Sequence, residues 1–206
     1  VQNAQRTFGK FTPKAALNYK LTPTIAAYTS YGLGFDTPAG NELDNYPLST
    51  NTTSMLNPDL LPQTSTNFEI GIKGIYAVDD LDYFRKVFFE ATFFNIKIDD
   101  EVVPFEVFGD VFFRNAAQTN RTGFELGADA ELLYGLRLKA AYTFSNFTYN
   151  DYIARNIVQD TLGNIVVQDS KFSGNVAPSV PKQNFSLALS YTRVLHDNIT
   201  GFVKTH

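Results

Sequence analysis

The chain has 206 residues and a formal net charge of −4, and it contains no Cys and only two His, His196 and His206. Disulfide scaffolds, thiolate sites and multi-histidine metal sites are therefore excluded, and the absence of a basic cluster argues against nucleic-acid binding. No apolar run approaches the roughly 18 residues that a membrane helix needs, although membrane barrels remain compatible because their strands alternate.

Much of the chain alternates between apolar and other positions with a period of two, which is typical of strands with one apolar face. In chain order, such strands are predicted at 67–73, 86–98, 123–132, 136–145, 184–191 and 199–205. Between residues 124 and 132 every even position is apolar, and every odd position is glycine or acidic. No apolar stripe at helical spacing lasts three turns, so we expect an all-β chain with about eight strands.

The parity of this pattern also predicts the tight turns. Leu132 and Leu136 belong to one face, so they should lie opposite each other across a three-residue loop at 133–135. Gly135 then occupies the third position, where this loop class needs a left-handed backbone. On the other face the same register would pair Glu131 with Arg137 and Asp129 with Lys139, each pair adding roughly 0.2–1 kcal/mol. The same rule predicts a second three-residue loop at 22–24, with Pro23 outside the ladder.

The connections between the predicted strands alternate in length. They are short around Pro23, long at 34–65, short at 78–85, medium at 99–110, short at 133–135, long at 150–182 and short at 194–198. In an up-and-down antiparallel sheet, this order places all short connections at one end and all longer ones at the other. Such sorting is typical of outer-membrane barrels, and a Greek-key sandwich has no reason to show it. The aromatics Tyr19, Tyr31, Tyr76, Tyr142, Phe144 and Tyr191 would suit interfacial girdles or ordinary strands.

Four segments resemble those of TonB-dependent outer-membrane receptors. They are YTSYGLGFDTP at 28–38, LNPDLLPQTSTNFEIGIK at 56–73, NAAQTNRTGFE at 115–125 and GNVAPSVPKQNF at 174–185. They resemble, in order, the family's Y-x-S-x-S-x-G-F-x-x-P, N-P-x-L-x-P-E-x-S-x-x-Y-E-x-G-x-K, N-A-G-…-R-x-G-x-E and G-x-x-x-P-x-x-P-x-H/N patterns. Gln63, Phe68 and Ala117 stand where the family usually has Glu, Tyr and Gly. The four segments occur in family order across most of the chain.

This resemblance implies an antiparallel up-and-down transmembrane β-barrel in the bacterial outer membrane. The family's barrels have 22 strands closed by an N-terminal plug, so we expect residues 1–206 to be part of such a barrel, without the plug and the final strand or strands. The implied function is import of a scarce ligand, most often a ferric siderophore, although haem, cobalamin, copper or a glycan would also suit the family. TonB would supply energy through regions outside this sequence, and outer-membrane lipid would surround the barrel.

Transport needs no covalent chemistry, so we expect no enzyme activity, catalytic residues, cofactor or bound metal. A chelated, often anionic complex suits aromatic stacking and arginine contacts in the longer connections. The candidate ligand-binding residues are Tyr46, Phe105, Phe108, Arg114, Tyr152 and Arg155. For each, packing within its own loop or pairing with a neighbouring carboxylate is the competing interpretation.

Two other classes of protein remain open at this point. A soluble β-sandwich that binds or adheres would explain the alternation but not the sorted connections or the four segments. A general porin-like barrel would share the architecture and would lack those segments. The acidic runs at 79–82 and 99–101 lack the glycine-spaced loop of helix-loop-helix calcium sites and read as solvated turns.

Overall fold

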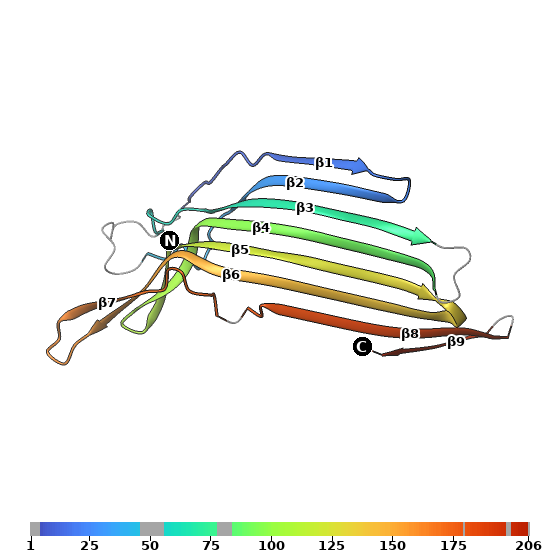
Figure 1. Cartoon of the computed structure of the whole chain (residues 1–206). Coiled ribbons are helices and arrows are strands. Elements are labelled where there is room, and N and C mark those ends of the chain that lie inside the picture. The colour runs from blue at the N-terminus through green and yellow to red at the C-terminus, as the bar shows by residue number, and fades with distance from the viewer. Residues whose placement is uncertain (1–4, 46–55, 78–83, 179, 197–198, 206) are drawn as a thin grey trace.

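A computed structural model describes residues 5–45, 56–77, 84–178, 180–196 and 199–205, and their strands form a single sheet (Figure 1). The strands are β1 (Lys14–Lys20), β2 (Ile25–Asp36), β3 (Gln63–Ala77), β4 (Phe84–Val107), β5 (Asp110–Leu132), β6 (Leu136–Gln159), β7 (Ile165–Lys171), β8 (Gln183–His196) and β9 (Ile199–Thr205). Their order is β1-β2-β3-β4-β5-β6-β8-β9, and β7 pairs with the C-terminal part of β6. The sheet is open, and it has no second layer in the described part, so these strands do not form a β-sandwich.

The only helical element among the described residues is a three-residue 3-10 turn at Leu133–Gly135. No described helix has the length and apolar character needed to cross a membrane. The prediction of an all-β chain is therefore confirmed.

The structure corrects two of the predictions about strands. The described residues form nine strands rather than about eight, because part of the predicted long connection at 150–182 forms the end of β6 and the short strand β7. The predicted medium connection at 99–110 is wrong, since β4 continues to Val107 and β5 starts at Asp110. Only Phe108 and Gly109 join them, with φ of 52° and 91°, a pair of left-handed residues as a tight hairpin requires.

The physical reason for the second error is Pro104, which follows an acidic run and suggests a loop. Pro104 lies opposite Phe113, on a stretch of β4 whose other edge is mostly unpaired, where the missing N–H disrupts no ladder. Val103, Phe105 and Val107 alternate around it and are buried.

The predicted turn registers are confirmed. Glu131 lies opposite Arg137 and Ala130 opposite Leu138, with the loop at Leu133–Gly135 as expected. Gly135 has a φ of 81°, and Tyr134 also adopts a left-handed backbone at 60°. At the other predicted loop, Leu21 N–H donates to the Ile25 carbonyl at 2.9 Å.

The two predicted short loops that are fully described lie at the same end of the sheet (Figure 1), but the two-residue β4–β5 connection at the opposite end breaks the predicted sorting by length. The loops at 22–24 and 133–135 lie at one end of the sheet, and β3–β4 and β8–β9 are joined at that end through residues that include undescribed ones. The β2–β3, β4–β5 and β6–β8 connections lie at the opposite end.

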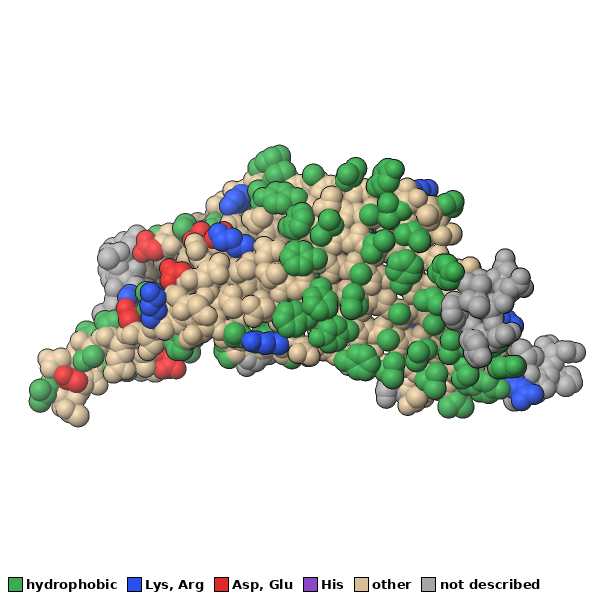
Figure 2. Space-filling view, in the orientation of Figure 1, with side chains coloured by type: hydrophobic (Ala, Val, Ile, Leu, Met, Phe, Trp, Pro, Cys, Tyr) green, Lys and Arg blue, Asp and Glu red, His purple; other side chains and the backbone are tan. Residues whose placement is uncertain are grey.

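One face of the sheet carries an apolar band. Cross-strand pairing places on this face Phe68, Ile70, Ile72, Gly74 and Tyr76 of β3; Val87, Phe89, Ala91 and Phe93 of β4; Phe124, Leu126, Ala128, Ala130 and Leu132 of β5; Leu136, Leu138, Ala140, Tyr142 and Phe144 of β6; and Phe185, Leu187, Leu189 and Tyr191 of β8. None of these residues is charged. Figure 2 shows hydrophobic side chains gathered over the half of the sheet near the short turns, and a mostly polar surface toward the other end.

The opposite face over the same height, here called the polar face, carries the charges. It includes Glu69 and Lys73 of β3, Glu90 of β4, Glu125, Asp129 and Glu131 of β5, and Arg137 and Lys139 of β6. The charges are thus segregated to one face of the sheet. Averaging over both faces gives the chain a mean hydropathy like that of a soluble protein, although one face is apolar.

Candidate functional site

Beyond the apolar band, two hairpins form a projecting arm, which comprises residues 102–116 of β4 and β5 and residues 153–171 of β6 and β7 (Figure 1). A short parallel pairing of Val107 with Ile157 joins the hairpins, and the Phe108 N–H donates to the Ile157 carbonyl at 3.0 Å. Phe105, Val107 and Ile157 are 4%, 1% and 5% exposed and pack together with Phe112. The arm therefore has a small apolar core of its own.

The predicted site residues Phe105 and Arg114 meet inside this arm. The Arg114 guanidinium lies over the Phe105 ring at 5.9 Å, and it also donates to the Ile153 carbonyl. Phe105 thus packs in the arm core, whereas Phe108 at the hairpin tip is half exposed. Arg114 links the β4–β5 hairpin to β6.

Arg155 joins the two strands of the other hairpin. Its guanidinium donates to both Asp169 carboxylate oxygens at 2.8 and 2.7 Å, and the two residues face each other in the β6–β7 register. Hydrogen bonding from Arg155 lowers the pKa of Asp169. At the hairpin tip, Asp160 accepts hydrogen bonds from the Leu162 and Asn164 N–H groups at 2.8 Å each. These contacts fix the shape of the β6–β7 hairpin.

Tyr152, another predicted residue, belongs to a row of four aromatic rings at the base of the arm. The ring centroids of Phe147 and Tyr149 are 6.4 Å apart, those of Tyr149 and Tyr152 are 4.7 Å apart, and those of Tyr152 and Phe172 are 5.8 Å apart. Sequence reasoning missed the other three members. Phe147 and Tyr149 lie at odd positions of β6, on the lumen face, so the alternation changes phase past the apolar band, and that change was the available signal. The remaining candidate, Tyr46, lies outside the described residues.

Three of the four family-like segments come together on the polar face, the first of them through Tyr28. Glu69 of the second segment, and Arg121 and Glu125 of the third, line one hollow of about 300 Å³ together with Tyr28, Glu90, Thr92, Phe94 and Ile96. The Tyr28 hydroxyl bonds the Thr92 hydroxyl at 2.8 Å, and Arg121 lies over the Phe94 ring at 5.8 Å while donating to the Ser145 hydroxyl at 2.9 Å.

Two glycines in these segments, Gly71 and Gly123, occupy positions where a larger residue would clash with a neighbouring aromatic ring. A Cβ on Gly71 would lie 2.7 Å from the Tyr28 ring, and a Cβ on Gly123 would lie 2.7 Å from the Phe94 ring. Each glycine thus leaves room for an aromatic ring that lies flat along the polar face. These close approaches explain the glycine that separates the charged positions in both segments.

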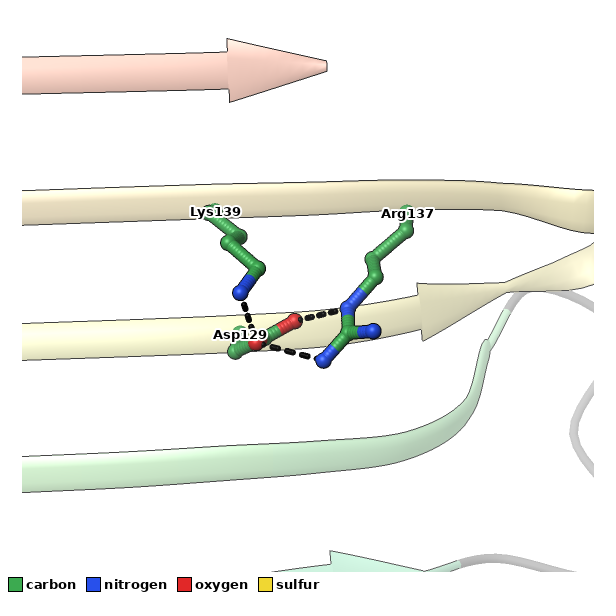
Figure 3. Close-up of polar contacts among 3 residues, drawn as sticks. All are labelled: Asp129, Arg137 and Lys139. Atoms are coloured by element: carbon green, nitrogen blue, oxygen red, sulfur yellow. Dashed lines mark hydrogen bonds and ion pairs between the residues drawn. The ribbon is translucent and has the colours of Figure 1, made fainter. Parts of the chain in front are cut away.

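Near the short turns, the polar face carries the ion-pair cluster of Figure 3. Asp129 accepts from Arg137 at 2.6 and 2.8 Å and pairs with Lys139 at 3.0 Å. The predicted Asp129–Lys139 pair is confirmed, whereas Arg137 reaches diagonally to Asp129 and not to Glu131 directly opposite. Among the described residues, no group of three His, Cys, Asp or Glu could hold a metal ion.

A family model described as "TonB dependent receptor-like, beta-barrel" matches residues 2–202. The chain belongs to the TonB-dependent receptor family. Members of this family are proteins of the bacterial outer membrane, so the apolar band is on the outer face of a barrel wall and the polar face lines the lumen.

Individual TonB-dependent receptors resemble the chain over only part of their length. A probable TonB-dependent siderophore receptor, PiuA of Acinetobacter baumannii, is 27% identical over 183 residues, which is 87% of this chain and 22% of that protein. The ferric-catecholate import receptor Fiu from E. coli K12 matches with a TM-score of 0.56 at 23% identity over 91% of this chain and 23% of its own. The Serratia marcescens hemophore receptor HasR, in complex with HasA and heme, matches at 0.62 and 18% identity over 89% and 30%. The chain therefore spans less than a third of each of these relatives.

Proposed function

We propose that the protein to which these residues belong imports a scarce ligand across the outer membrane, and that this ligand is a ferric siderophore. Residues 1–206 form part of its barrel wall and carry no catalysis. The uncharged outer band, combined with a charged lumen face, is the observation that carries this proposal, because a protein in lipid must keep charges off its outer surface. The ligand class is supported by two similar proteins, since PiuA is described as a probable siderophore receptor and Fiu as a ferric-catecholate import receptor.

The arm and the aromatic row supply the ligand contacts in this proposal. Tyr152 and the neighbouring rings offer stacking surface for a planar chelate, and Phe108 offers an exposed ring at the arm tip. Arg114 and Arg155 stay candidates for ligand contact in this proposal, Arg155 within its ion pair with Asp169 and Arg114 held in place by Phe105. Tyr46 stays a candidate from the sequence alone. TonB would act through regions outside this sequence, and lipid acyl chains would cover the apolar band.

The test is uptake and binding by the full-length receptor. Cells that express it should accumulate radiolabelled iron from a ferric siderophore only when TonB is present, with ferric catecholate and ferric hydroxamate complexes and haem as the panel. Accumulation that is independent of TonB, or no binding of any ferric siderophore in that panel, would contradict the proposal.

A paired substitution tests the aromatic row. Tyr149→Ala with Tyr152→Ala should weaken binding of the accepted ligand about tenfold, because aromatic contacts contribute about 0.5–1.5 kcal/mol each. Tyr134→Ala is the matched control, since this tyrosine is 84% exposed in the short turn at the opposite end. Equal affinities for the double variant and the control would exclude the aromatic row from the binding site.

A further inference from the structure

A carboxylate lies beside the aromatic row at the base of the arm. Pairing places Ala117 opposite Glu101 on one side and opposite Tyr152 on the other, so these three residues share the lumen face with Thr119 and Tyr149. Both neighbours of β5 have one extra residue here, because the register shifts in β4 just before Glu101 and in β6 just after Tyr149. These bulges bring Glu101 and Tyr152 to the same face of the sheet.

Two oxygen atoms in this part of the lumen face are buried without a partner. Glu101 Oε2 and Thr119 Oγ1 are shielded from solvent, and neither has a hydrogen-bond partner among the described residues. Thr119 as a whole is 1% exposed. Most buried polar atoms in proteins have a partner, so two unsatisfied oxygens on neighbouring residue pairs indicate a place for a group that donates hydrogen bonds.

The charge of Glu101 is not neutralised by another described side chain. Glu101 forms no ion pair with a described residue. Arg121 lies two residue pairs away on the lumen face, but its guanidinium donates to the Ser145 hydroxyl at 2.9 Å, which is farther from Glu101 along the strands. Burial, followed by the neighbouring Tyr152 and Glu101, raises the pKa of the Tyr149 hydroxyl. Neutral rings therefore lie beside one negative charge.

The rings of the aromatic row remain partly exposed. Phe147, Tyr149 and Tyr152 are half-buried, and Phe172 is 39% exposed. The centroids of Tyr149 and Tyr152 are 4.7 Å apart, and their planes are tilted by 36°. A cation can therefore reach ring surface at this place, with Glu101 as its counter-charge.

We propose that Glu101 and the aromatic row bind a protonated amine on the transported chelate. This inference rests on the proposed function and adds a cationic group to the ligand. The faces of aromatic rings attract cations within about 6 Å, and an ammonium offers N–H donors to carboxylate and hydroxyl oxygens. A bare divalent metal ion fits less well, because no three His, Cys, Asp or Glu gather into a metal site among the described residues.

The experiment measures the binding of matched chelates to the purified full-length receptor by isothermal titration calorimetry at pH 7. The probes are a ferric trihydroxamate and a ferric tricatecholate, each with a free terminal amine and each again with that amine acetylated, which removes its charge. The wild type should bind the free-amine form of the chelate that it accepts about tenfold more tightly than the acetylated form. Glu101→Gln should abolish this preference and leave the affinity for the acetylated form unchanged.

Glu106→Gln is the matched control, because Glu106 is an exposed carboxylate on the same strand, and this variant should keep the full preference. If Glu101→Gln does not fold, Tyr152→Leu serves in its place and should reduce the preference about threefold by removing one ring. Equal affinities of the wild type for the two forms, or an unchanged preference in Glu101→Gln or in Tyr152→Leu, would overturn the inference. Failure of the wild type to bind any ferric chelate of the panel would contradict the proposed function instead, so the two failures are distinguishable.

Discussion

Gly123 of β5 is a residue at which the neighbouring strands leave no room for a side chain. A Cβ there would lie 2.7 Å from the Phe94 ring and would also press on the Phe144 backbone carbonyl. Gly123→Ala should therefore destabilise the barrel by about 1–3 kcal/mol, as overpacking typically does. The measurement is the urea midpoint of the purified receptor, with Gly40→Ala as the control because nothing lies within 4 Å of a Cβ at that position. Equal midpoints for the two variants would show that the Phe94 ring and the Phe144 backbone both yield without cost, which would contradict this account of Gly123.

At this scale the sequence predicted which residues lie opposite each other across the β5–β6 turn, but it did not predict every side-chain contact between them. Parity correctly placed Glu131 opposite Arg137 and Asp129 opposite Lys139. Yet the long guanidinium of Arg137 reaches across to Asp129, where it makes two hydrogen bonds. A period of two determines which face a residue occupies, but the rotamer of a long side chain depends on diagonal neighbours that pairing alone does not rank.

At the scale of elements, the arm should loosen independently of the barrel wall. Ile157 is 5% exposed and holds β6 against β4 in the arm core. Ile157→Ala should cost about 2–5 kcal/mol of local stability by leaving a cavity. Amide hydrogen exchange should then rise in residues 102–116 and 153–171 and stay unchanged in 124–132.

The control for this substitution is Ile165→Ala on β7, where the side chain is 53% exposed and removal leaves no cavity. It should leave exchange in the arm near the wild-type rate. If Ile157→Ala raised exchange equally throughout β5 and β6, the arm and the wall would be one cooperative unit and this account of the arm would be wrong.

The β6–β7 hairpin should also respond to acid through Asp169. Hydrogen bonding from Arg155 lowers the pKa of Asp169 from 3.8. Because the folded-state pKa lies below the unfolded value, the pair contributes its full stability above about pH 4 and loses it as the pH falls through the lowered pKa. At pH 7 the amides of β7 should therefore be better protected from exchange in the wild type than in Asp169→Asn. This difference should vanish in strong acid. A difference that persists unchanged at pH 2 would contradict the role of this ion pair.

The arm is also where sequence reasoning failed on elements. An acidic run before Pro104 and a polar stretch after Asn150 both suggested loops. The strands there are stabilised by contacts between the two hairpins, above all Val107 against Ile157, and these residues are 50 positions apart in the sequence. The periodicity of a single segment contains no information about contacts between residues so far apart in the sequence. For the same reason Tyr152 was found without Phe172, although their rings are neighbours.

On the scale of the whole molecule, alternation carried most of the information. Between Phe124 and Leu132 the outer residues are apolar and the lumen residues are polar or glycine, and the same holds across β6. Nine residues of strand match the 9–11 that a tilted transmembrane strand needs. The fold class could be predicted because it depends on this simple period, whereas the two-residue β4–β5 connection broke the predicted sorting of connection lengths. The lumen hollow could not be predicted, since it gathers side chains from four strands.

The central claim is that the apolar face meets lipid and the polar face lines a lumen. Ala140 and Ala141 are consecutive residues at mid-height of β6, and they lie on the outer and the lumen face respectively. Arg at a lipid-facing midplane position costs about 2–4 kcal/mol, whereas a lumen position tolerates charge. The measurement is the folding free energy of the full-length receptor in lipid vesicles, compared between Ala140→Arg and Ala141→Arg. A loss of this size for Ala140→Arg alone is the predicted result, and an equal or larger loss for Ala141→Arg would contradict the assignment of the two faces.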